Sequence, residues 1–146
     1  MFWIVNCNTS ICRIYAYHKP DQITLLKEIN HPENKLKNSE LVSDKPGHYQ
    51  AGTVARGAYS PDTDPKQVKI IDFLKEVARE LDHGRNNQAY SNLIIIAAPQ
   101  TSGLLTQQLN KHVNNLISNH IHKDLIHLTE HELLHFIKEN AQYPDS

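Results

Sequence analysis

The stretch Leu93-Ile94-Ile95-Ile96-Ala97-Ala98, ended by Pro99, decides the fold of this chain. Every residue in it is apolar, so a strand built from it would present apolar side chains on both faces. Such a run is typical of a central strand that is buried on both sides of a sheet. We therefore expect this stretch to be the middle of the protein, with the other elements arranged around it.

Three further strands are predicted upstream, over residues 3–5, 11–17 and 23–29. Each is rich in β-branched, aromatic or other large apolar residues, which favour strands. Asn8-Thr9 lies between the first two and predicts a turn, and Pro20-Asp21 marks the connection to the third. The N-terminal thirty residues are therefore expected to form strands.

A long helix is predicted to begin at Asp64-Pro65, where the aspartate is a typical N-cap and the proline suits the first helical position. Its apolar residues between 70 and 81 fall within an arc of roughly 160° at the helical period. Gly84 is expected to end it.

Two more helices and one strand are predicted in the last third of the chain. After Gly103, a helix is expected from Leu104 to about Leu116, and residues 117–121 are expected to form a strand. The last helix is predicted to begin at Thr129, because Thr129 and Glu132 have the spacing of a capping box.

Strands that come first, followed by alternating helix and strand, predict an α/β fold with a mixed β-sheet flanked by helices. We expect a single domain over residues 1–146, a length that suits one hydrophobic core. Between the third strand and the long helix, at about 31–63, no periodicity is visible. A structureless stretch of this length inside a domain is typical of a functional loop.

The composition excludes several classes of protein. With 15 Lys and Arg against 16 Asp and Glu, the net charge is −1, which excludes a strongly basic nucleic-acid binder. No apolar run reaches 18 residues, and the N-terminus lacks a basic segment before its apolar residues. We therefore expect a cytoplasmic protein that has no membrane partner.

The two cysteines, Cys7 and Cys12, flank the first predicted turn. They could pair across a hairpin or remain two small buried thiols. A reducing compartment favours the thiols, and no partner residue at a suitable spacing marks either as a nucleophile.

Residues 131–135, His-Glu-Leu-Leu-His, match the HExxH pattern of zinc hydrolases. In that pattern His131 and His135 bind zinc from one face of a helix, and Glu132 acts as general base. Here the capping box places His131 in the first helical turn, and the apolar residues beside the two histidines lie on the opposite face. We therefore expect a solvent-facing helix with no metal, and the zinc hydrolase remains the alternative function.

The loop between the third strand and the long helix contains several cations and an aromatic residue. Such a combination can bind a phosphate backbone, although interspersed Glu33, Glu40 and Asp44 equally suit a loop that is only solvated. The residues that would bind are Lys35, Lys37, Lys45, His48, Tyr49 and Arg56.

Short motifs spread over almost the whole chain resemble those of one bacterial family. In chain order they are Trp3 with Arg13-Ile14-Tyr15, His31-Pro32-Glu33, Leu41-Val42-Ser43-Asp44-Lys45-Pro46-Gly47, Asp64-Pro65, Ala97-Ala98-Pro99 with Gly103-Leu104-Leu105, and Lys123-Asp124-Leu125. This pattern resembles the host attachment proteins, which are described as required for attachment to host cells. The chain departs from the family at Cys7-Asn8 and at Thr106, where Ala-Asp and an arginine are usual.

That family in turn is similar to the middle domain of archaeal and eukaryotic peptide-chain release factors and Pelota. The resemblance implies a mixed sheet flanked by helices, with a loop that holds a Gly-Gly-Gln tripeptide in release factors. The corresponding stretch here is Gly47-His48-Tyr49-Gln50-Ala51-Gly52, which keeps Gln50 but lacks the paired glycines. Paired glycines adopt backbone angles that His48 and Tyr49 adopt only at a cost. Peptidyl-tRNA hydrolysis is therefore not expected.

Together these observations predict a non-catalytic binding module without a cofactor. We expect residues 31–60, including Gln50, to contact RNA, tRNA or the ribosome, or else a protein partner, and we do not expect DNA binding. Because no export signal is visible, any effect on attachment to host cells is expected to be indirect.

Overall fold

The sheet has five strands in the order β3-β2-β1-β4-β5. The computed structural model describes residues 1–18, 22–31 and 65–140. Within these residues the strands are β1 (Phe2–Cys7), β2 (Ile11–His18), β3 (Gln22–Asn30), β4 (Asn92–Ile96) and β5 (Ile117–Ile121). All five agree closely with the strands predicted from the sequence.

The sheet is mixed, as predicted. β1 pairs with β2, and β2 with β3, in antiparallel orientation, whereas β1 pairs with β4, and β4 with β5, in parallel. The β1–β2 turn is held by Asn8, whose N–H donates to Ile11 O at 3.0 Å and whose Oδ1 accepts from the N–H groups of Ser10 and Ile11. An asparagine that bonds to backbone N–H groups two and three residues ahead stabilises a tight turn.

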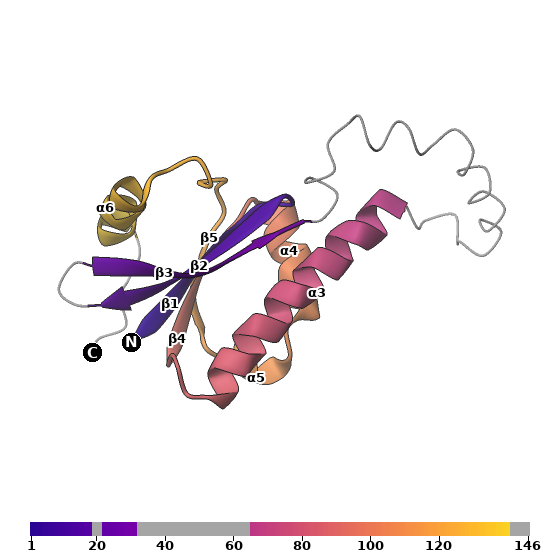
Figure 1. Cartoon of the computed structure of the whole chain (residues 1–146), viewed down its shortest axis with the longest axis horizontal. Helices are drawn as coiled ribbons and strands as arrows, with labels where there is room; N and C mark the ends of the chain where they lie inside the picture. The colour runs from indigo at the N-terminus through magenta and orange to yellow at the C-terminus, as the bar shows by residue number, and fades with distance from the viewer. Residues whose placement is uncertain (19–21, 32–64, 141–146) are drawn as a thin grey trace, which may run out of the picture.

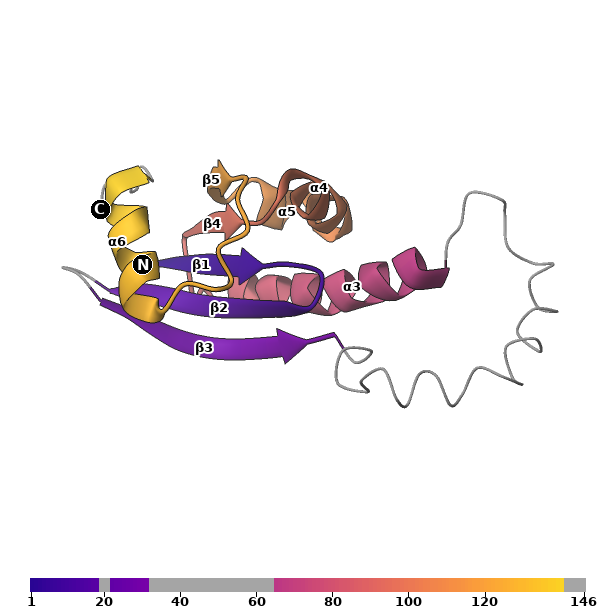
Figure 2. The same cartoon turned by 90° about the horizontal axis from the view of Figure 1, so that it is seen from above.

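Helices cover both faces of the sheet (Figure 1 and Figure 2). One cluster of core residues packs between one face of the sheet and three helices. A second cluster packs between the other face and a single helix. The three are α3 (Pro65–Asn86), α4 (Pro99–Gln108) and α5 (Lys111–Asn114), and the single helix is α6 (Glu130–Asn140). Among the described residues, no helix is long and apolar enough to cross a membrane.

The strand predicted as central is buried on both faces. Residues 93–97 are all fully inaccessible to solvent. Leu93 and Ile95 pack in the core under α3, α4 and α5, whereas Ile94 and Ile96 pack in the core under α6. The alternation follows from the strand period of two, and it confirms the role predicted for this stretch.

The helix predicted after Gly103 begins earlier and is divided in two. α4 begins at Pro99, whose fixed φ suits a first helical residue, so Gly103 lies inside the helix. α4 ends at Gln108, and Asn110 then caps the separate helix α5, with its side chain accepting a hydrogen bond from Val113 N at 2.8 Å. The prediction of one helix over 104–116 was therefore wrong, because Asn110 begins a new helix within that range.

Gly84 was also misinterpreted, because α3 continues through it to Asn86. The helix ends in a motif centred on Gln88, which has a positive φ of 57°. Ala89 N donates to Gly84 O at 2.9 Å and Gln88 N to Arg85 O at 3.0 Å, the two bonds of a Schellman C-cap. Gly84 is instead required by packing, since a Cβ there would lie 2.7 Å from Trp3 Cζ3 and 3.1 Å from Tyr90 Cε1.

Gly84→Ala is expected to destabilise the protein by about 1–3 kcal/mol, because the added methyl group overlaps the Trp3 ring inside the core. Gly103→Ala is the matched control. A Cβ at Gly103 meets no atom within 4 Å, so alanine should stabilise α4 by about 0.5–1 kcal/mol. Urea unfolding followed by circular dichroism measures both, and equal stabilisation by the two substitutions would refute the packing argument.

Gln88→Gly is expected to stabilise the protein by about 1 kcal/mol, since glycine adopts the left-handed conformation of the C-cap without steric cost. Asn86→Gly, two residues earlier and still helical, should have the opposite sign. The same unfolding measurement distinguishes them. A loss of stability in Gln88→Gly would contradict this assignment of the cap.

Candidate functional site

The topology gathers the starts of two helices at one end of the sheet. β1, β4 and β5 are parallel, and β3 runs in the same direction because β2 is antiparallel to both β1 and β3. The carboxyl ends of these four strands therefore lie together, and α3 and α4 begin there (Figure 1 and Figure 2). We call this the carboxyl end of the sheet. Ligands of open α/β sheets bind outside the carboxyl ends of the strands.

The predicted binding loop starts from this end. His31, its first residue, is 6% exposed, and its N–H donates to Ser10 O at 2.9 Å. Its ring lies 5.5 Å from that of Phe73 in α3, so His31, the residue after β3, packs against the core. The loop residues predicted to bind lie outside the described residues; they are Lys35, Lys37, Lys45, His48, Tyr49, Gln50 and Arg56.

The first two turns of α3 are positively charged. Lys66 and Lys69 are exposed in its first two turns, and the first turn contains no acidic residue. The first acidic side chain of the helix is Asp72. Because a helix N-terminus already has a partial positive charge, cations placed there favour an anion nearby.

The start of α4 adds polar groups that the sequence did not single out. Thr101 and Ser102 are 7% and 3% exposed, and Ser102 Oγ lies 3.4 Å from His120 Nδ1 in β5. The His120 ring is 5.9 Å from that of His122. Burial, and then His122, lower the pKa of His120. Nothing in the sequence places Ser102 beside His120, because the contact depends on the β4–β5 pairing.

The HExxH residues do not form a metal site in this structure. Thr129 and Glu132 form the predicted capping box, with Thr129 N donating to Glu132 Oε1 at 2.9 Å and Glu132 N to Thr129 Oγ1 at 3.1 Å. His131 and His135 are exposed, and His135 lies 3.3 Å from Glu139. Among the described residues, no three His, Cys, Asp or Glu side chains converge as metal ligands. The Glu132 carboxylate therefore caps the helix instead of acting as the general base beside a zinc-bound water.

Cys7 and Cys12 are free thiols, as expected from the sequence. They face each other across the β1–β2 pair, and both are fully buried under α3. A hydrogen bond with Cys7, together with burial, raises the pKa of Cys12. Buried thiols with a raised pKa are poor nucleophiles.

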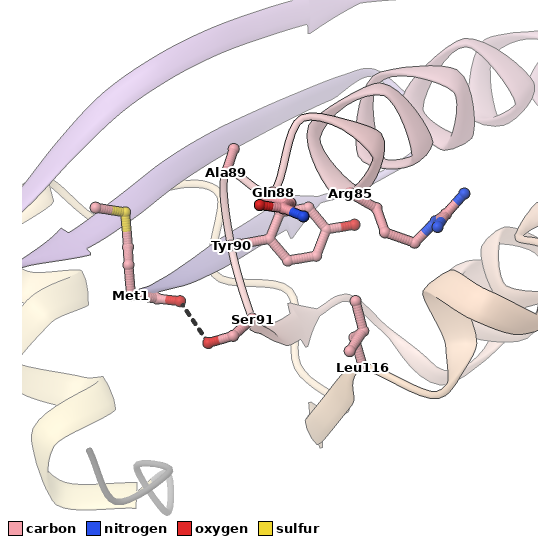
Figure 3. Close-up of a pocket in the computed structure, with 7 residues that line it drawn as sticks. All are labelled: Met1, Arg85, Gln88, Ala89, Tyr90, Ser91 and Leu116. Atoms are coloured by element: carbon pink, nitrogen blue, oxygen red, sulfur yellow. Dashed lines mark hydrogen bonds between the residues drawn. The ribbon is translucent and has the colours of Figure 1, made fainter.

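A pocket at the opposite end of the sheet has polar groups that the fold already uses. It encloses about 370 Å³ and is lined by Met1, Arg85, Gln88, Ala89, Tyr90, Ser91 and Leu116 (Figure 3). Ser91 Oγ donates to Met1 O at 3.1 Å, and Tyr90 Oη donates to Leu81 O at 2.6 Å. Arg85 is paired with Asp82 at 3.0 Å. These bonds join β4 to β1 and to α3, so we assign the pocket a structural role.

The connection between β5 and α6, residues 122–129, is held on the sheet by two side chains. Asn6 Nδ2 donates to Leu125 O at 3.2 Å, and Arg13 Nη1 donates to Ile126 O at 2.9 Å. Arg13 is itself paired with Glu28 at 2.9 Å. The shallow groove beside this connection is lined partly by Tyr15 and Leu25. The Arg13 guanidinium already bonds to Ile126 O and to Glu28. Among the described residues, the groove is therefore lined by no unpaired lysine or arginine.

Comparison with known proteins gives a family for the chain. The family model described as "Protein required for attachment to host cells" matches residues 3–136. An uncharacterised protein of Rickettsia prowazekii (strain Madrid E) is 27% identical over 111 residues, which are 75% of this chain and 69% of that protein. A solved structure described as an archaeal protein matches 96% of this chain and 36% of its own, with 11% identity and a TM-score of 0.48. This chain thus spans about a third of that structure's length.

Tyr90 is expected to make the protein less stable in alkali. Burial raises its pKa to about 12, whereas an unfolded tyrosine ionises near 10. Between these values the unfolded chain loses a proton that the folded protein keeps, so stability falls as pH rises from about 10 to 12. Absorbance titration of tyrosinate should show a late-ionising group that is missing in Tyr90→Phe. An identical titration of the two proteins would contradict this assignment.

Proposed function

This chain belongs to the family of proteins required for attachment to host cells, and we propose that it acts as a non-catalytic module that binds RNA, tRNA or the ribosome through residues 31–60. In this proposal the protein works in the cytoplasm, and its effect on attachment is indirect, through the expression of surface components. A protein surface is the other kind of partner that the same loop suits.

The position of the loop supports the proposal. Residues 31–60 follow the end of β3 and precede the start of α3, and both of these lie at the carboxyl end of the sheet (Figure 1), where open α/β sheets bind their ligands. His31 is buried against Phe73, so the loop starts from a fixed point on the core. A loop held on a rigid scaffold is the usual position for binding residues.

The charged side chains within residues 31–60 and at the start of α3 support an anionic partner. Within residues 31–60 the cations are Lys35, Lys37, Lys45 and Arg56, and the described start of α3 adds Lys66 and Lys69. Lysine and arginine contacts to phosphates supply most of the sequence-independent affinity for nucleic acids. Tyr49 offers an aromatic ring on which a base can stack. Glu33, Glu40 and Asp44 lie in the same range, so residues 31–60 have an excess of one positive charge.

We propose the ribosome as the partner because the chain resembles the middle domain of release factors and Pelota. In that fold the loop after the third strand is the part that enters the ribosome. Residues 47–52 of this chain lack the paired glycines that accompany the catalytic glutamine there. We therefore propose contact without peptidyl-tRNA hydrolysis.

Ribosome co-sedimentation at low and high salt tests the proposal. The full chain is expected to sediment with ribosomes at low salt and to be released as salt rises. The triple variant K35E/K37E/K45E should bind more weakly, with the logarithmic salt dependence reduced by about one for each lost phosphate contact. The control K75E/K111E/K138E makes the same change of charge at exposed positions on α3, α5 and α6, and it should bind like the wild type.

Two results would refute the proposal. One is the absence of wild-type protein from the ribosome pellet at low salt. The other is an equal loss of binding in the loop variant and in the control, which would show a dependence on net charge alone.

A further inference from the structure

Two histidines lie side by side at the point where β5 ends. His120 is in β5, His122 follows the last residue of the strand, and the centres of their rings are 5.9 Å apart. Residues two positions apart on an extended strand project from the same face, which accounts for the contact between the rings. Both side chains are exposed, so an ion in solution can reach them. Imidazole is also the side chain that most often binds a metal.

The separation of the two rings is close to that of two imidazoles on one metal ion. A zinc–nitrogen bond of about 2.0–2.1 Å places each ring centre about 3 Å from the ion, and two rings on a tetrahedral ion then have centres about 5 Å apart. The two rings of this protein are 5.9 Å apart. Because the His122 side chain is exposed, a small rotation about its side-chain bonds brings the rings to the distance that an ion requires.

His120 also has the kind of supporting contact that metal-bound histidines have. Its Nδ1 lies 3.4 Å from Oγ of Ser102 in α4, and Ser102 is only 3% exposed. A histidine that binds a metal through one ring nitrogen typically donates the N–H of the other to an oxygen atom, which fixes the tautomer and the orientation of the ring. When Nδ1–H of His120 donates to Ser102, the lone pair of Nε2 is available to the ion.

The charged residues that follow in the chain are directed elsewhere. The ammonium of Lys123 lies 5.7 Å from the ring centre of Phe136, which packs in the core under α6 on the other face of the sheet. The Asp124 carboxylate accepts from Ile126 N at 3.4 Å, within its own loop. Among the described residues, no third histidine, cysteine or carboxylate converges on the pair. The protein therefore offers two nitrogen ligands, and water would complete the coordination of an ion.

We propose that His120 and His122 bind a divalent transition-metal ion through one ring nitrogen each, and that Ser102 positions the His120 ring. Imidazole ligands suit Zn²⁺, Cu²⁺ and Ni²⁺, whereas Mg²⁺ and Ca²⁺ prefer oxygen ligands. This pair is separate from His131 and His135, which belong to α6 on the other face of the sheet. The proposal does not rest on the proposed function, because it uses no residue between 31 and 60.

The test is an NMR titration of the histidine ring signals of the full chain with Zn²⁺. Saturable shifts are expected at His120 and His122 with one ion per chain, and Mg²⁺ at the same concentrations should shift neither. Ser102→Ala keeps both ligands and should weaken Zn²⁺ binding by about tenfold, and His122→Gln should weaken it by more, because it removes a ligand. His127→Gln is the matched control, since it removes another exposed histidine of the same connection, and it should bind Zn²⁺ like the wild type.

The double variant His131→Gln/His135→Gln tests the other pair of histidines with a ligand-like spacing. His135 already lies 3.3 Å from Glu139, so this variant should keep the full affinity for Zn²⁺. Loss of Zn²⁺ binding in this variant, with binding retained in His122→Gln, would overturn the proposal. The absence of a saturable shift at His120 and His122 would overturn it as well.

An affinity for Zn²⁺ that is the same in Ser102→Ala and in the wild type would overturn the positioning role of Ser102. The loop variant K35E/K37E/K45E should bind Zn²⁺ like the wild type. Failure of ribosome binding and failure of this metal site are therefore separate outcomes.

Discussion

The burial of β4 on both faces is the constraint on which the rest of the structure depends. The side chains of Leu93 and Ile95 lie on one face of the sheet, and those of Ile94 and Ile96 lie on the other. Because all four are apolar, both faces must be covered by other elements that exclude water. The chain meets this requirement with α3, α4 and α5 on one face and α6 on the other. Because β4 is parallel to both of its neighbours, each connection has to cross back over the sheet, and helices make those crossings.

The same parallel pairing places the starts of α3 and α4 at one end of the sheet. Helices that cross back between parallel strands begin at the end of the sheet where those strands finish, so α3 and α4 both start at the carboxyl end. Their N-termini carry partial positive charge, and the side chains nearby are lysine, histidine, serine and threonine. The opposite end is occupied by structural bonds among Met1, Ser91 and Tyr90. The binding of an anionic partner through residues 31–60 is therefore proposed at the carboxyl end of the sheet.

Two glycines that would be typical of helix boundaries lie inside helices instead. Glycine is typical of helix ends, and Gly84 lies close to one, yet it is there because the Trp3 ring passes against the helix backbone. The helix ends at Asn86, and its C-cap is centred on Gln88, a residue that does not favour a positive φ. Similarly, Gly103 suggested a break before a helix that in fact begins at Pro99. The C-cap at Gln88 sets the end of α3, and Pro99 sets the start of α4, so neither glycine marks a boundary.

The sequence by itself determined the five strands, the buried role of residues 93–97, the capping box at Thr129 and the exposed position of His131 and His135. These depend on periodicity and on side-chain to backbone bonds within a few residues, which can be recognised locally. Only the tertiary structure decided the strand order, the approach of Trp3 to Gly84, and the placement of Ser102 beside His120. Those contacts join residues far apart in the chain, and their geometry follows from strand pairing and core packing, which no local pattern encodes.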